Sequence, residues 1–258
     1  MNKYAIAAQH SVSSFTGIAR TFFAHPGFAL RLFRRRLRYF LSRKFKGTLL
    51  TPDRFTIDTP DTLIAYWSMF VERELYNARW AGPVRKASRP LIVDVGANAG
   101  VLSHFAFCLN PSAEIIAFEP LPAMVKRLNA LQKRTGMNLT CYPKAISHSV
   151  GEVLFESPHG YDGTSHISTA AEPAGNTFRV ETTTLDTILG ERKVTLMKID
   201  VEGFECDVIA GGRRVLANTQ YLIAEAQTAE HLENVTRALG PGWLRRKLGS
   251  SDYLFYRD

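Results

Sequence analysis

The sequence predicts an α/β protein built on a mostly parallel, doubly wound sheet. Beyond about residue 90, short apolar runs of strand length alternate with longer runs of helical spacing. Acidic residues and glycines follow the ends of several of the apolar runs. Strands covered by helices on both faces read as continuous apolar segments, and alternation with helices is typical of parallel sheets. At 258 residues and 45% hydrophobic content, the chain can bury one sizeable core.

Three parts are predicted along the chain. Residues 1–50 form a basic leader, residues 51–90 a helical lead-in with one helix over 62–80, and residues 91–258 the α/β domain. In the domain we expect strands at 91–95, 115–119, 139–142, 152–156, 178–184, 194–200, 221–226 and 252–257. We expect helices at 99–109, 121–134, 203–217 and 229–239. The last strand should lie near the edge of the sheet, with an antiparallel orientation as one option.

The net charge of +8 is concentrated at the N-terminus. Residues 1–52 contain ten Lys and Arg and no acid, which leaves 22 basic and 24 acidic residues in the remainder. A near-neutral body argues against a broad nucleic-acid groove. The three cysteines form no CxxC pair, which suits a reducing compartment, and we find neither a secretory signal nor a transmembrane run. We therefore expect a cytoplasmic protein.

The segment "DVGANAG", residues 94–100, predicts a ligand loop at the end of the first strand. Gly96 and Gly100 allow a tight turn and close approach of the backbone, and Asn98 tolerates a left-handed conformation. The pattern fits a pyrophosphate-binding loop poorly, because Asp94 at its start would repel phosphates. An acid there suits a ligand that carries a cationic amine.

The next strand ends at Glu119, where a carboxylate can accept hydrogen bonds from both hydroxyls of a ribose. A ribose together with a cation and no phosphate describes S-adenosylmethionine. The alternative is that Asp94 and Glu119 only cap the helices that follow them.

A third group of charges lies in "LMKIDVEGFECDVIAGG", residues 196–212. Lys198, Asp200 and Glu202 are spaced by two and would share one face of a continuing strand, directed at the ligand crevice. Two neighbouring carboxylates at a strand end repel each other, so their presence indicates a functional role. A nearby lysine reduces this repulsion. Glu205 and Asp207 are explained by the first turns of a helix, where acids suit the dipole.

Together, the segments "DVGANAG", "AFEP", "AISHSVGEV", "TTTLDTIL" and "MKIDVEGFE…VIAGG" resemble the FkbM-type methyltransferases in order and spacing over about residues 70–257. The resemblance implies a seven-stranded Rossmann-like sheet and S-adenosylmethionine as cofactor. It implies that Asp94, Gly96 and Gly100 line the methionine part, with Glu119 at the ribose and Ala145 and Ile146 beside the adenine. Asn98 and Pro120 complete the expected cofactor-binding set. His148 replaces a small polar residue that is common in such proteins.

The same resemblance implies methylation of a hydroxyl on a saccharide, glycolipid or secondary metabolite, as in polysaccharide biosynthesis, with Asp200 at the reaction centre. Asp200 is the first candidate for the general base, followed by Glu202 and Lys198. His166 and His159 lie in a polar loop that could cover the acceptor. No metal ligand is assigned, although a divalent ion held by Asp200, Glu202 and a loop histidine is an alternative.

The leader segment 28–46, "FALRLFRRRLRYFLSRKFK", predicts a basic amphipathic helix. Leu30, Phe33, Leu37, Phe40, Leu41 and Phe45 form one stripe, which Arg34 and Lys44 interrupt. Such a helix suits an anionic membrane surface, and the alternative is a helix packed on the domain with solvated arginines. Nucleic acid is a less favoured partner, because no aromatic platform for bases is evident.

Two other functions stay open. A catalytically silent member of the family would bind the cofactor or a glycan without turnover. An RNA or protein methyltransferase would use the leader to hold an anionic acceptor. A nicotinamide dehydrogenase is disfavoured by the missing third glycine and by Asp94.

Overall fold

The computed structural model describes residues 25–42, 47–67, 79–156, 166–167, 177–249 and 251–257. The chain divides into two compact units, residues 1–77 and residues 78–258, and each is described by itself. Among the described helices, none is both long enough and apolar enough to cross a membrane.

The first unit contains a long helix, a small hairpin and a short helix. These elements are α3 (Pro26–Ser42), β1 (Leu49–Leu50), β2 (Thr56–Ile57) and α4 (Pro60–Tyr66). The hairpin was not predicted and lies between the two helices expected over 28–46 and 62–80. It forms because Arg54 turns with a positive φ of 69° and Thr51 closes the loop. The Oγ of Thr51 accepts a hydrogen bond from the Phe55 amide at 2.8 Å.

The lead-in helix predicted over residues 62–80 is also wrong at both ends. Helix α4 begins earlier, at Pro60, because Thr59 and Thr62 form a reciprocal capping box at its N-terminus. Residues 79–80 are a turn, and residues 68–78 lie outside the described residues.

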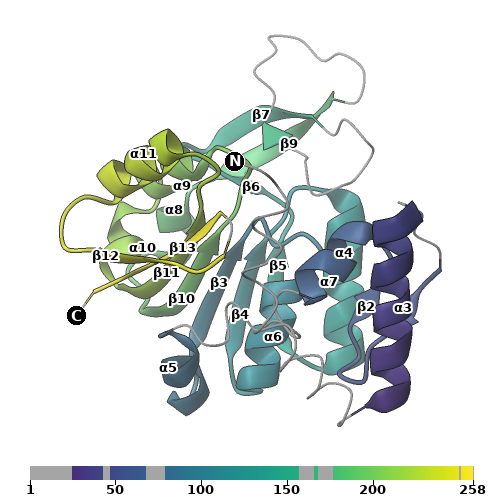
Figure 1. Ribbon diagram of the computed structural model, residues 1–258. Helices are drawn as coiled ribbons and strands as arrows, with labels where there is room; N and C mark the ends of the chain where they lie inside the picture. The colour runs from purple at the N-terminus through teal and green to yellow at the C-terminus, as the bar shows by residue number, and fades with distance from the viewer. Residues whose placement is uncertain are drawn as a thin grey trace. The chain divides into compact units, whose positions relative to one another are not determined.

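The second unit is built on the predicted seven-stranded, mostly parallel sheet (Figure 1). Its spatial order is β12-β13-β11-β10-β3-β4-β5, so the strand order reverses between β3 and β10. The parallel strands are β3 (Leu91–Val95), β4 (Glu114–Phe118), β5 (Asn138–Tyr142), β10 (Val194–Ile199) and β11 (Thr219–Glu225). The antiparallel edge consists of β12 (Leu244–Lys247) and β13 (Asp252–Tyr256).

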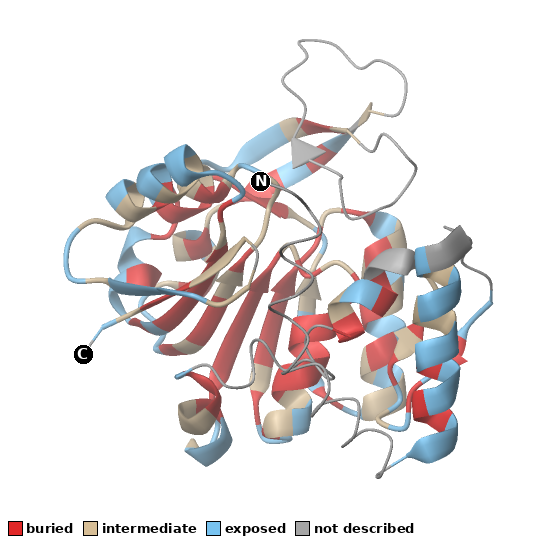
Figure 2. Cartoon of the chain, viewed as in Figure 1, coloured by how far each residue is buried: buried red, intermediate tan, exposed pale blue. Residues whose placement is uncertain are grey.

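Helices connect these strands, and their apolar sides bury the sheet. They are α5 (Ala81–Lys86), α6 (Val101–Leu109), α7 (Pro122–Thr135), α8 (Leu185–Leu189), α9 (Glu205–Ala210), α10 (Arg213–Ala217) and α11 (Ala229–Leu239). All five residues of β3 are buried, including Asp94, as its apolar sequence predicts (Figure 2). A second, smaller sheet has the order β6-β9-β7-β8, with β6 (Ala145–Ile146), β7 (Gly151–Glu156), β8 (His166–Ile167) and β9 (Thr177–Thr183).

The single helix predicted over residues 203–217 is instead two short helices, α9 and α10, broken at Gly211 and Gly212. A Cβ on Gly211 would lie 2.2 Å from the backbone oxygen of Ser147, so only glycine permits this approach. The Asp186 carboxylate then caps α10 by accepting hydrogen bonds from the Arg214 and Val215 amides at 3.0 Å. The break therefore joins this segment to the smaller sheet.

Candidate functional site

The turn after β3 is held against the two neighbouring strand ends. The Gly96 amide donates to the Phe118 carbonyl at 3.0 Å, and the Asp200 amide donates to the Val95 carbonyl at 3.1 Å. Gly96 has a φ of 77°, and a Cβ there would lie 1.9 Å from the Asp200 backbone oxygen. No residue other than glycine fits, which explains why the sequence places glycine directly after the strand.

A cavity opens at the carboxyl ends of β3, β4 and β10, beside the point of strand-order reversal. It encloses about 700 Å³ of empty space, including the part that is open to solvent. In open parallel sheets, ligands bind at this place. Eight of the twelve predicted site residues line it: Gly96, Asn98, Glu119, Pro120, Ala145, Ile146, Asp200 and Glu202.

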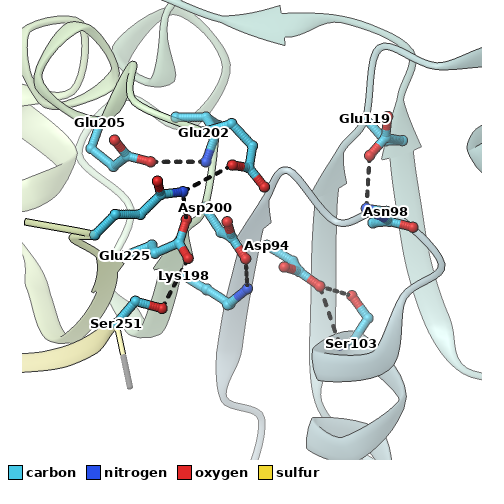
Figure 3. Close-up of polar contacts among 12 residues, drawn as sticks. Asp94, Asn98, Ser103, Glu119, Lys198, Asp200, Glu202, Glu205, Glu225 and Ser251 are labelled. Carbon is cyan, nitrogen blue, oxygen red and sulfur yellow. Dashed lines mark hydrogen bonds and ion pairs between the residues drawn. The ribbon is translucent and has the colours of Figure 1, made fainter. Parts of the chain in front are cut away.

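Glu119 is the most buried acid that lines this cavity, at 4% exposure. Its two carboxylate oxygens accept hydrogen bonds from the Asn98 amide at 2.7 Å and the Leu121 amide at 2.9 Å (Figure 3). Burial raises the pKa of Glu119 to about 7, against the lowering effect of these two amides. Each carboxylate oxygen has a second lone pair, so Glu119 can still accept hydrogen bonds from a ligand.

Asp94 and Gly100 support the loop from behind and are not among the residues that line the cavity. The Asp94 carboxylate accepts hydrogen bonds from the Ser103 hydroxyl at 2.6 Å and the Ser103 amide at 3.2 Å. Asp94 thus caps α6, which is the alternative that the sequence left open. Gly100 has a φ of 79°, and a Cβ there would lie 2.6 Å from Leu128 on α7. Direct ligand contact by either residue stays a prediction.

Lys198 lies beneath the strand ends and forms an ion pair with Asp200 (Figure 3). Burial alone would lower the pKa of Lys198, but the surrounding negative charges outweigh it and raise the pKa. Those charges belong to Asp200, Asp252 and Asp94. Lys198 is not among the cavity-lining residues, so its position fits the neutralisation of the acids around it better than contact with a ligand.

The strand does not continue beyond Ile199, so Glu202 reaches the cavity through a turn instead of along a shared strand face. Its φ is 54°, and Asn98, also at the cavity, has a φ of 48°. Only three non-glycine residues in the described ranges have a positive φ, and two of them line the cavity. Strained backbone of this kind concentrates at functional sites.

A third acid, Glu225 at the end of β11, joins Asp200 and Glu202. One oxygen of each carboxylate lies within 4.8 Å of the other two. The pKa of Glu202 is raised to about 7, mainly by burial and then by the negative charges of Glu225 and Asp200. Gln227 bridges the pair by donating to Glu202 at 3.1 Å and to Glu225 at 3.4 Å. Glu202 can therefore gain and lose a proton near neutral pH.

Glu205 interacts with the turn before α9 as well as with the dipole of that helix. It is fully buried, and its carboxylate accepts hydrogen bonds from the Val201 amide at 3.0 Å and the Gly203 amide at 3.4 Å. Its other oxygen lies 2.8 Å from Nε2 of His231 on α11. Glu205 thus fixes the turn that presents Asp200 and Glu202. The two amide contacts are local, whereas no local pattern signals the approach of His231, which is 26 positions away.

Of the two loop histidines predicted to cover the acceptor, only His166 is among the described residues. His166 lies in β8, where it pairs with Glu156 of β7, and His159 lies outside the described residues. His148 places Nδ1 2.9 Å from the Asp207 carboxylate. This contact is exposed and lies outside the set of cavity-lining residues.

Comparisons with known proteins identify the family of the chain. Residues 94–241, more than half of the chain, match the model of the Methyltransferase FkbM domain. The hexuronic acid methyltransferase AglP of Haloferax volcanii is 28% identical over 159 residues, which cover 60% of this chain and 63% of that protein. The 2-O-methyltransferase NoeI of Sinorhizobium fredii is 28% identical over 166 residues, which cover 56% and 66%. The chain thus spans a little under two thirds of these relatives.

Among solved structures, the SAM-dependent O-methyltransferase TM0748 of Thermotoga maritima aligns with a TM-score of 0.44 at 11% identity. The alignment covers 81% of this chain and 84% of that one.

Proposed function

Because the chain belongs to the FkbM methyltransferase domain family, we propose that it binds S-adenosylmethionine in the cavity and methylates a hydroxyl group of a saccharide. The observation that carries the proposal is Glu119, a nearly buried carboxylate at the end of β4 that lines the cavity. A carboxylate in that place can accept hydrogen bonds from both hydroxyls of a ribose.

The other residues of the cavity fit the same ligand. Ala145, Ile146 and Phe155 offer apolar surface for the adenine, and Asp200 and Glu202 would stabilise the sulfonium or ammonium charge of a ligand bound in this cavity. The cavity is lined by three carboxylates and one cation, Lys144, which suits a cationic ligand and disfavours a dinucleotide with two phosphates.

When bound, S-adenosylmethionine supplies an activated methyl group on a sulfonium centre. The protein has to orient the acceptor hydroxyl and take its proton. Glu202, with a pKa of about 7, is better matched to proton transfer at neutral pH than Asp200, which is held in an ion pair by Lys198. We therefore assign Glu202 as the general base and Asp200 to orienting the acceptor hydroxyl.

Saccharide as the acceptor class rests on the relatives and on the charge of the site. The names of two relatives refer to hexuronic acid and to 2-O-methylation. Asp200, Glu202 and Glu225 together make an acidic site that can accept hydrogen bonds from several hydroxyls and would repel a polyanion such as RNA.

The experiment is a transfer assay with methyl-labelled S-adenosylmethionine and a panel of neutral saccharides, hexuronic acid glycosides and RNA. We expect the label on a saccharide oxygen, located by NMR, with neutral acceptors preferred over uronic acids because of the carboxylates. Label in RNA, or cofactor binding without transfer to any saccharide, would refute the acceptor class.

The affinity for S-adenosylmethionine should depend on pH through Glu119. A carboxyl with a pKa of about 7 in the ligand-free protein is ionised at pH 8 and mostly protonated at pH 6. Only the carboxylate accepts from both ribose hydroxyls, so binding should weaken roughly tenfold from pH 8 to pH 6. Equilibrium dialysis at the two pH values measures this. Glu119→Gln, which cannot ionise, should reduce the dependence, and an unchanged pH dependence in that variant would exclude Glu119 as its source.

A further inference from the structure

Helix α3 carries two apolar faces, and only one of them is used within its unit. Phe28 and Leu32 are buried at 5% and 1% exposure, and the Phe28 ring meets Tyr66 edge-on at 6.3 Å. Two arginines support the same packing. Arg35 donates to the Gly47 and Ile57 carbonyls, and Arg36 lies 4.4 Å from the ring centre of Trp67. The packed face of α3 is therefore complete without the remaining apolar side chains.

The second face is an exposed apolar stripe, formed by Leu30, Phe33, Leu37 and Phe40. Their spacing of three, four and three residues puts them on one side of a helix. They are 40%, 45%, 45% and 67% exposed. The described residues contain eight exposed large hydrophobic side chains, so half of them lie on this one helix. In Figure 2, α3 shows buried, intermediate and exposed residues, with the buried ones on one part of its surface.

The border of this stripe is basic. At 100° per residue, Arg31, Arg34 and Arg38 fall on one flank of the exposed apolar stripe, and all three are exposed. Helix α3 contains no acidic residue, and residues 1–52 as a whole contain ten basic residues and no acid. An exposed apolar stripe with an arginine flank is typical of helices that lie in the interface of an anionic bilayer.

We propose that the exposed stripe of α3 binds an anionic phospholipid surface, with the four apolar side chains in the acyl region and the arginines at the headgroups. A second copy of the chain is a poorer occupant, because pairing the stripes would bring the two arginine flanks together. Nucleic acid would use the arginines but leave Leu30 and Leu37 in water.

The test is co-sedimentation of the full chain with vesicles of phosphatidylcholine containing 30% phosphatidylglycerol, and with vesicles of phosphatidylcholine alone. We expect binding to the anionic vesicles and little to the neutral ones. The double variant R31Q/R34Q should weaken binding roughly 30-fold, about fivefold for each arginine. The double variant F33S/L37S should weaken it about tenfold or more.

Matched controls lie in the second unit. K193Q/R246Q removes two exposed charges, and V150S/L244S removes two exposed apolar side chains. Both should bind as the wild type does, and thermal melting checks that every variant is folded. Three results would overturn the proposal: no binding of the folded wild type to anionic vesicles, undiminished binding of F33S/L37S, or a change of oligomeric state in F33S/L37S, which would assign the stripe to a second copy.

Discussion

Replacing Glu202 by glutamine should lower kcat for methyl transfer by roughly 10²- to 10⁴-fold, the usual contribution of a positioned base. Glutamine keeps the size and the hydrogen bond to Gln227 but cannot take a proton. In the wild type, kcat should rise with pH to a plateau, because Glu202 must be ionised to act. The pKa of about 7 is that of the ligand-free protein, and a bound sulfonium would lower it, so the rise should lie below pH 7. The variant should show a flat profile. Steady-state rates between pH 5.5 and 9 measure both features.

Glu225→Gln is the matched control, since Glu225 neighbours Glu202 and is also bridged by Gln227. The negative charge of Glu225 raises the pKa of Glu202. Removing that charge should shift the rise of kcat to lower pH while the plateau stays within a few fold of the wild type. An equal loss of kcat in the two variants would contradict the assignment of Glu202 as the base.

Replacing Lys198 by methionine should lower the free energy of unfolding by about 3 kcal/mol, at the low end for breaking a buried ion pair because Asp200 is partly exposed. Lys198 is the cation that offsets Asp94, Asp200 and Asp252, and Asp94 is almost fully buried. Without it, these carboxylates repel one another in a poorly solvated place. Urea unfolding at pH 7.5 measures the loss, with Lys193→Met as an exposed control that should change stability by less than about 0.5 kcal/mol.

The difference in the free energy of unfolding between the wild type and Lys198→Met should become smaller as the pH falls. Burial raises the pKa of Asp94, and Lys198 opposes this rise, so the variant raises the pKa further. A carboxyl group whose pKa is higher in the folded than in the unfolded protein lowers stability at pH values above the unfolded pKa. As the pH falls through the folded pKa, the carboxyl takes up a proton and this loss of stability disappears. A difference that grows between pH 7.5 and pH 5 would contradict the electrostatic role of Lys198.

Most of the sheet could be predicted because its strands are continuous apolar runs, as in Leu91–Val95, and the FkbM resemblance is confirmed by the family match. Strand β12 was missed, since "LRRK" is exposed at every position and pairs only at the sheet edge. The helix over 203–217 was wrong because a helical pattern does not reveal that Gly211 meets a distant carbonyl.

The site was predictable where a side chain follows a strand end, and less so where contacts are long-range. Glu119 and Asp200 come directly after β4 and β10, and both line the cavity. Asp94 was predicted to face the ligand, but the sequence does not show that Ser103 takes up its carboxylate. The approach of His231 to Glu205 and the contribution of Glu225 to the acid cluster are both long-range, so no local pattern in the sequence predicts them.

For the leader, too, the sequence predicted one part of the arrangement and the structure was needed for the other. Helical spacing predicted a stripe of six apolar residues that also included Leu41 and Phe45. The four whose side chains are described, Leu30, Phe33, Leu37 and Phe40, lie on α3. Spacing alone does not tell which of two apolar faces packs inward. The contacts of Phe28 and Leu32 identify the buried face and leave the predicted stripe exposed. Residues 43–46, the end of the predicted helix, lie outside the described residues.

The central claim is that the cavity beside Glu119 binds S-adenosylmethionine. Calorimetric titration of the full chain with S-adenosylmethionine, with NAD as the control ligand, tests it most directly. We predict micromolar binding of S-adenosylmethionine alone, weakened at least tenfold (about 1.4 kcal/mol) in Glu119→Gln, with that variant shown by melting to be folded. Absence of binding by the folded wild type, or equal binding of NAD, would contradict the claim.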